Sequence, residues 1–95
     1  MTRPYDQAVT LEGSWKVRRV AGLLPPGVTK EIDGSRGRTL LFGVHFGAFR
    51  VDGDRFVYQL WPIVDVVEPD PDRADAFVGR GTVFGLTFCR FRMER

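Results

Sequence analysis

Two arginines near the C-terminus, Arg90 and Arg92, have a spacing that points to a binding role. Residues two apart in a strand point to the same face. If that face is inward, the guanidiniums need an anion, because an unpaired buried charge costs several kcal/mol. Asp65 or Glu68, or a ligand carboxylate or phosphate held bidentately, would supply it. If the face is outward, Cys89 and Phe91 fill the interior and the arginines are solvated. The outward arrangement gives the more apolar interior and is favoured.

Asp65 lies between two valines and is the acid for which the sequence most strongly predicts burial. One interpretation makes it the buried partner of a nearby arginine such as Arg50 or Arg80. The other makes it a polar anchor or proton acceptor inside a pocket. An Asp65→Asn variant that keeps its fold but loses binding would favour the second.

His45 and Cys89 are the only histidine and the only cysteine. A histidine base needs a nucleophile within hydrogen-bond reach, and nothing in the spacing of these two residues brings them together. One histidine and one cysteine do not make a zinc site, and Cys89 is better explained as a small core residue. The sequence predicts no catalytic residues, no metal and no cofactor, so a non-enzymatic role is favoured.

The elements that must position these residues are short strands. Eleven glycines and six prolines in 95 residues favour an all-β fold, and no helical stripe extends over ten residues. Alternation with period two predicts strands at 13–21, 28–33, 38–42, 49–51, 54–60 and 63–68, and a hairpin over 79–94 folded at Phe84-Gly85. Between 38–42 and 49–51 we expect a glycine-interrupted piece at 43–47.

We predict a single domain over 1–95: a small antiparallel meander of about eight strands, closed into a barrel because closure removes exposed sheet edges. Gly13-Ser14-Trp15 is its opening edge and the terminal hairpin its closing edge. A flattened β-sandwich is the alternative. Residues 1–12 are expected to form a short turn or a frayed segment.

Composition limits the functional classes. Fourteen Lys and Arg against twelve Asp and Glu give a net charge of +2, too small to indicate a nucleic-acid partner. A single cysteine excludes an internal disulfide. No signal-peptide pattern is evident, and no apolar run approaches the roughly 18 residues of a membrane span. We expect a cytoplasmic protein without a membrane partner.

The two ends of the chain resemble the lipocalins and fatty-acid-binding proteins. Gly13-Ser14-Trp15 resembles the Gly-x-Trp signature that opens their first strand, and Thr87 to Arg95 is similar to their last strand. The resemblance implies that Gly13, Trp15 and a terminal-strand arginine, Arg90 or Arg92, close the barrel. In fatty-acid-binding proteins an Arg-x-Tyr pattern holds a ligand carboxylate; here it falls on Arg90-x-Arg92, and the tyrosine is absent.

From Leu11 to Glu94 the chain also resembles a group of short uncharacterised actinobacterial proteins. The shared features are the Gly-x-Trp start, the Gly-Leu-Leu-Pro-Pro loop at 22–26, the Phe-Arg-Val hairpin at 49–51 and the Val-Asp-Val-x-Glu-Pro segment at 64–69. This resemblance implies no activity.

The leading functional hypothesis is non-enzymatic binding of a small apolar or amphipathic molecule with an acidic end, which an arginine would receive. The alternative is a homodimerising module with a self-filled core, in which the apolar loop at 22–27 forms the contact. Nucleic-acid binding is a third, weaker hypothesis. The predicted ligand-binding residues are Arg90, Arg92, Arg50, Asp65, Tyr58, Trp61 and Phe46.

Overall fold

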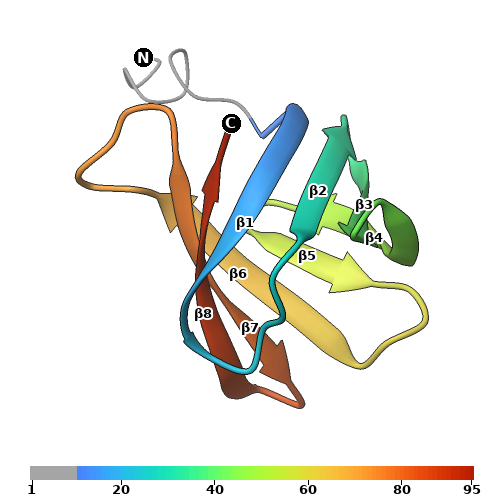
Figure 1. Ribbon diagram of the computed structural model, residues 1–95. Coiled ribbons are helices and arrows are strands. Elements are labelled where there is room, and N and C mark those ends of the chain that lie inside the picture. Colours follow the sequence, from blue (N-terminus) through green and yellow to red (C-terminus); the bar gives the residue numbers. More distant parts are fainter. Residues whose placement is uncertain (1–10) are drawn as a thin grey trace.

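The computed structural model describes residues 11–95, which form a closed antiparallel β-barrel (Figure 1). The eight strands are β1 (Gly13–Gly22), β2 (Val28–Asp33), β3 (Arg36–Leu41), β4 (Val44–Asp52), β5 (Arg55–Tyr58), β6 (Ile63–Pro69), β7 (Phe77–Val83) and β8 (Leu86–Glu94). Each strand pairs with the next, and β8 pairs with β1. The predicted all-β meander barrel is confirmed. The segment expected to form an N-terminal turn lies almost wholly outside the described residues.

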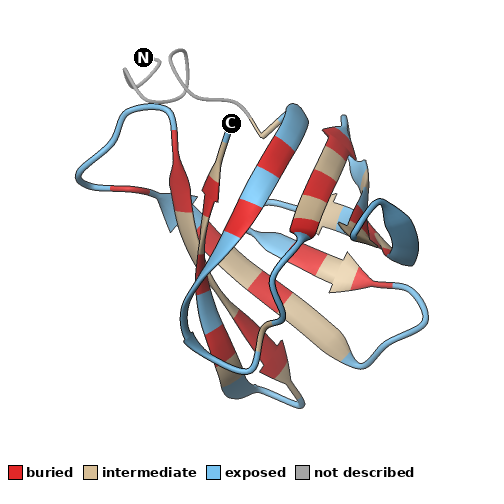
Figure 2. Cartoon of the chain, viewed as in Figure 1, coloured by how far each residue is buried: buried red, intermediate tan, exposed pale blue. Residues whose placement is uncertain are grey.

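The barrel forms because its strands alternate between buried and exposed side chains, as the stripes of Figure 2 show. In β2, Val28, Lys30 and Ile32 are all buried. In β8, Cys89, Phe91 and Met93 are buried while the residues between them are more exposed. One face of each strand therefore fills a common interior.

The barrel closes through antiparallel pairing of β1 with β8, in which Val17 lies opposite Met93 and Gly22 opposite Cys89. The predicted pairing of the opening and closing edges is confirmed. A glycine-interrupted piece was expected over 43–47. Gly43 lies in the turn after β3, but Gly47 does not interrupt β4, which is continuous from Val44 to Asp52. A β-bulge there absorbs one extra residue and lets the ladder continue.

Two inward glycines make room for aromatic rings. Gly37 lies opposite Phe49 across β3 and β4, and Gly79 lies opposite Phe91 across β7 and β8. A Cβ atom on Gly37 would lie 2.4 Å from the Phe49 ring, and one on Gly79 would lie 2.7 Å from the Phe91 ring. Each ring therefore covers the backbone of the opposite strand. A larger residue in place of either glycine would occupy the position of the ring.

Trp15 lies near the start of β1 and is only 1% exposed. Its ring meets Phe77 edge-on at 5.4 Å between centroids, and its Nε1 donates a hydrogen bond to the Leu11 carbonyl. The guanidinium of Arg95 lies 4.0 Å from the ring centroid. We expected Arg90 or Arg92 to provide this cation; Arg95 does so instead, because the side chains of Arg90 and Arg92 lie on the outer face of β8.

Candidate functional site

A cavity of about 250 Å³ lies inside the barrel. It is at the end formed by the β1–β2, β3–β4, β5–β6 and β7–β8 connections, which a meander places together. Its apolar lining comes from Val17, Leu23, Leu24, Pro25, Val28, Leu41, Phe46, Ile63, Phe88 and Phe91. Its polar lining comes from Lys30, Thr39, Tyr58 and Asp65. The site is therefore an apolar chamber with one polar cluster.

Two β-bulges supply aromatic rings to this chamber. Across β3 and β4, Thr39 pairs with Gly47 and Leu40 with His45, which leaves Phe46 as the extra residue. Across β7 and β8, the pairing likewise skips Phe88. Both phenylalanines line the cavity. The bulges thus re-aim side chains that regular alternation would direct elsewhere.

The polar cluster is built around the ammonium group of Lys30. Lys30 Nζ lies 3.0 Å from Asp65 Oδ2, 2.7 Å from Thr39 Oγ1 and 2.5 Å from the Tyr58 hydroxyl. The hydroxyls of Thr39 and Tyr58 are 2.6 Å apart, and Tyr58 donates to Asp65 Oδ2 at 3.2 Å. All four residues are buried. Four different strands therefore contribute to one hydrogen-bonded group.

The hydrogen bonds of this cluster satisfy Lys30 completely. An ammonium group has three N–H donors, and each has an acceptor here. The cation also lies 5.2 Å from the Phe49 ring centroid and 5.9 Å from the centroids of Phe56 and Phe91. Aromatic faces attract a desolvated cation. The buried charge is thus paired with a carboxylate and enclosed by rings.

The environment keeps Lys30 protonated and Tyr58 neutral. Burial alone would lower the pKa of Lys30, but the carboxylate of Asp65 and the oxygen of Tyr58 outweigh it and raise the pKa above 10.5. Burial raises the pKa of Tyr58 above 10.0 although the Lys30 charge opposes it. A lysine nucleophile or a tyrosinate base needs the opposite shifts. The cluster therefore suits a structural or binding role.

Stability should fall at alkaline pH. Lys30 has a raised folded-state pKa, so its contribution is complete below 10.5 and is lost as pH rises through the folded value. The neutral Tyr58 is preferred in the fold, so unfolding is favoured increasingly above pH 10.0. Urea unfolding between pH 9 and pH 12 should show this decline. A Lys30→Met variant should show a shallower slope, and an unchanged slope would contradict the assignment to Lys30.

The structure brings together some of the predicted site residues. Asp65, Tyr58 and Phe46 line the cavity. Trp61 lies at its mouth, stacked on Phe46 with ring centroids 5.2 Å apart, and it donates a hydrogen bond from Nε1 to the Phe46 carbonyl. The predicted partners of Asp65 were Arg50 and Arg80, but its partner is Lys30.

The three predicted arginines do not enter the cavity. Arg90 and Arg50 are exposed, on the outer faces of β8 and β4. Arg92 Nε lies 3.0 Å from Asp70 Oδ2, an ion pair without the alignment of a hydrogen bond. The outward arrangement of β8, the one favoured by the apolar pattern, is confirmed.

Sequence reasoning missed Lys30 and Thr39. A signal for Lys30 was present, since it lies between Val28 and Ile32 on a face that is otherwise apolar. A charge at an inward strand position needs a partner. Thr39 had no comparable signal, because threonine is common on both faces of a strand.

Cys89 and His45 are separated by the barrel architecture. Cys89 is buried in the cavity, where burial raises the pKa of its thiol. His45 is exposed on β4, opposite Leu40. A catalytic thiol needs a lowered pKa, so Cys89 does not have the environment of a nucleophile. Within residues 11–95 there is no cluster of three His, Cys, Asp or Glu side chains suited to a metal ion.

Comparison with protein-family models, curated proteins and solved structures gives no match. Within residues 11–95 no helix is long and apolar enough to cross a membrane. The fold and site together define a small closed antiparallel β-barrel with an internal apolar cavity.

Proposed function

We propose that this protein binds a small, mainly apolar molecule inside the barrel without chemically altering it. The observation that carries the proposal is the apolar cavity with one polar cluster in its wall. Such a combination is typical of small-molecule sites, where apolar walls provide affinity and a few polar groups fix orientation. The raised pKa values of Lys30 and Tyr58 support binding over catalysis.

The cavity volume limits the ligand. A dry cavity of about 150 Å³ accommodates benzene. A cavity of about 250 Å³ therefore suits a ligand on the order of ten non-hydrogen atoms. A long fatty acid would need to extend out of the cavity.

The polar end of the ligand is better matched by a neutral hydrogen-bond donor than by an acid. The acidic end predicted from the sequence relied on inward arginines, and these face outward. The ammonium group of Lys30, the inward cation, already contacts three acceptors, on Asp65, Thr39 and Tyr58. The hydrogen bonds to Asp65 from described residues reach Oδ2, which leaves Oδ1 to accept from a ligand hydroxyl or amine. A ligand carboxylate there would meet a second negative charge.

We further propose that the barrel is an abbreviated relative of the lipocalins and fatty-acid-binding proteins. The meander order, Gly13 and Trp15 at the start of β1, and a cation over the Trp15 ring support this relation. A cytoplasmic location is part of the same proposal, supported by the single cysteine, Cys89.

Binding of 1-octanol and of octanoic acid, followed by the amide NMR shifts of the cavity residues, tests the proposal. We expect octanol to bind more tightly and Cys89→Leu, which fills the cavity, to weaken binding by at least about tenfold. Cys89→Ala is the matched control, because it preserves the space and should retain binding. Tighter binding of octanoic acid would restore the acidic-end hypothesis.

If neither compound shifts the cavity resonances and the protein sediments as a dimer, the alternative of a homodimerising module would replace the binding proposal. Exposed apolar residues at the cavity mouth, such as Leu60 and Phe84, are the observation that favours this alternative.

A further inference from the structure

The four connections around the cavity mouth contain no charged residue. They comprise residues 23–27, 42–43, 59–62 and 84–85. The connections at the opposite end include Asp54 and the acidic segment 70–76. Charged and polar residues are the ordinary composition of exposed turns. The two ends of the barrel therefore present different surfaces to their surroundings.

Two of the mouth connections are tight turns with an unusual residue at the tip. Phe42 and Phe84 both have a φ of 50°, and the glycines after them have φ values of 80° and 81°. Two successive positive φ angles favour Asn-Gly or Gly-Gly, because a bulky side chain is strained there. The tight turns at the other end use Gly34 and Gly53 at positive φ.

Burial does not compensate for the strain, since Phe42 is 71% and Phe84 85% exposed. The Phe42 ring lies over the backbone of Gly27, whereas Phe84 departs from the turn rules without a folding benefit, which indicates a functional constraint. Neighbouring connections expose further large apolar side chains. We call the set the apolar rim: Leu23, Phe42, Leu60, Trp61, Phe84 and Leu86.

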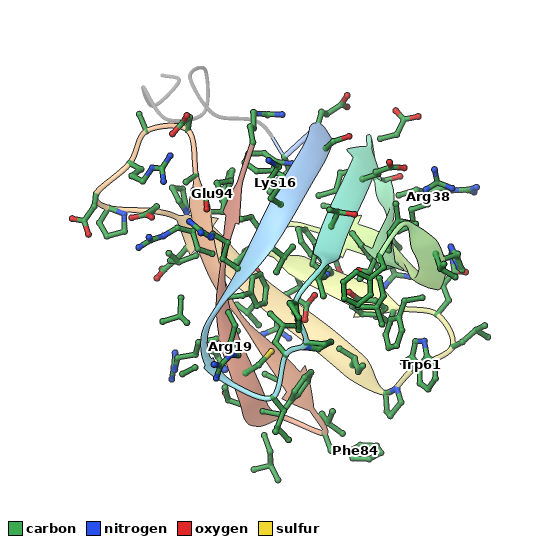
Figure 3. All side chains as sticks on the ribbon, viewed as in Figure 1. Lys16, Arg19, Arg38, Trp61, Phe84 and Glu94 are labelled. Carbon is green, nitrogen blue, oxygen red and sulfur yellow. The ribbon has the colours of Figure 1, made fainter. Side chains whose placement is uncertain are left out.

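A basic belt lies just behind the rim. Arg80 and Arg90 are directly opposite each other across β7 and β8, and Arg19 lies nearby on β1, opposite Phe91. None of the three forms an ion pair with a carboxylate among the described residues. Like charges in directly opposed positions destabilise a sheet unless an anion is present. In Figure 3, Arg19 lies in the same half of the molecule as Phe84, and Glu94 lies in the other half.

We infer that the apolar rim docks on the surface of an anionic lipid bilayer, with the basic belt against the phosphates. Arg80 lies three residues from Val83, about 10 Å along the strand, and less along the barrel axis because barrel strands are tilted. Peripheral elements enter the headgroup region by about 5–10 Å. Rim residues would therefore reach the acyl boundary while the arginines contact phosphate.

Charge favours a lipid surface over a second copy of the chain. Two rims face to face would bring two sets of arginines without ion-pair partners closer together, which opposes association. We consider the three strand residues that flank each mouth connection on either side. Among these described residues Asp65 is the one carboxylate, and it is buried and paired with Lys30. Trp61 is also a residue suited to a membrane interface.

Vesicles of phosphatidylcholine, with and without phosphatidylglycerol, test the inference by co-sedimentation and tryptophan emission. We expect binding to the anionic vesicles, a blue shift that Trp61→Phe removes, and weakening by salt.

Phe42→Asn/Phe84→Asn should keep or raise the melting temperature, because asparagine tolerates positive φ, and reduce binding more than about tenfold. Arg80→Gln/Arg90→Gln should weaken it about fivefold per arginine.

Asp54→Asn, in the opposite hairpin, is the matched control and should bind as the unaltered protein does. Cys89→Leu should also bind vesicles normally, so failure of the cavity proposal and failure of the docking inference are distinguishable. The inference is overturned if the unaltered protein does not bind anionic vesicles, or if Phe42→Asn/Phe84→Asn binds them as tightly as the unaltered protein. It is also overturned if ultracentrifugation shows a dimer that the rim substitutions dissociate.

Discussion

Replacing Lys30 by methionine is expected to lower the free energy of unfolding by about 3–5 kcal/mol. Methionine matches the length of the lysine stem, so the change removes the charge with little change in packing. The carboxylate of Asp65, which is 6% exposed, then remains in an apolar interior without its cation. The loss is dominated by this uncompensated charge. Chemical denaturation near neutral pH measures it.

The double variant Lys30→Met/Asp65→Leu separates this explanation from a general packing defect. Removing both charges leaves Thr39 and Tyr58 hydrogen-bonded to each other, and the interior gains apolar contacts. Buried ion pairs are often replaceable by apolar residues at no net cost. The double variant should therefore recover most of the stability lost by Lys30→Met. If it is as unstable as the sum of the single variants, the pair is not coupled and the assignment fails.

Trp15→Ala is expected to cost about 3–5 kcal/mol, the range for removing a buried tryptophan. The side chain is 1% exposed, contacts Phe77 edge-on and donates a hydrogen bond to Leu11. Its loss would leave a void near the start of β1. Equilibrium unfolding followed by circular dichroism gives the change.

Arg95→Gln is a milder substitution at the same contact and should lower the free energy of unfolding less than Trp15→Ala does. It removes the guanidinium 4.0 Å from the indole centroid, worth about 0.5–2 kcal/mol, and leaves the packing of Trp15 intact. Arg90→Gln should not lower stability, since that side chain is exposed and lies opposite the like charge of Arg80. A larger loss from Arg90→Gln than from Arg95→Gln would contradict the placement of the cation over Trp15.

The fold was predictable because alternation and turn residues, which specify strands and hairpins, are visible within a few neighbouring residues. Period-two alternation identified β2 and β6 closely, and Phe84-Gly85 was located as the fold of the last hairpin. The β4 interruption was mispredicted because a bulge depends on the opposing strand. No pattern within residues 43–47 shows which residue the partner strand will skip.

The candidate site was only partly predictable because its members are far apart in sequence. Asp65 was expected to be buried beside a cation, but the cation is contributed by Lys30 on β2, 35 positions earlier. The expected cation was a nearby arginine such as Arg50 or Arg80. Which cation reaches Asp65 depends on barrel closure and strand register, which no short stretch of sequence contains.

The sequence alone indicated that this chain is all-β and built of short alternating strands, since these features follow from side-chain periodicity and turn chemistry. The pairing of its two ends was a prediction that the β1–β8 ladder confirms. The tertiary structure decided what the faces do. Closure gathers Lys30, Thr39, Tyr58 and Asp65 from four strands around one cavity. It also gathers four apolar connections at one end, because a meander returns every second turn to the same side.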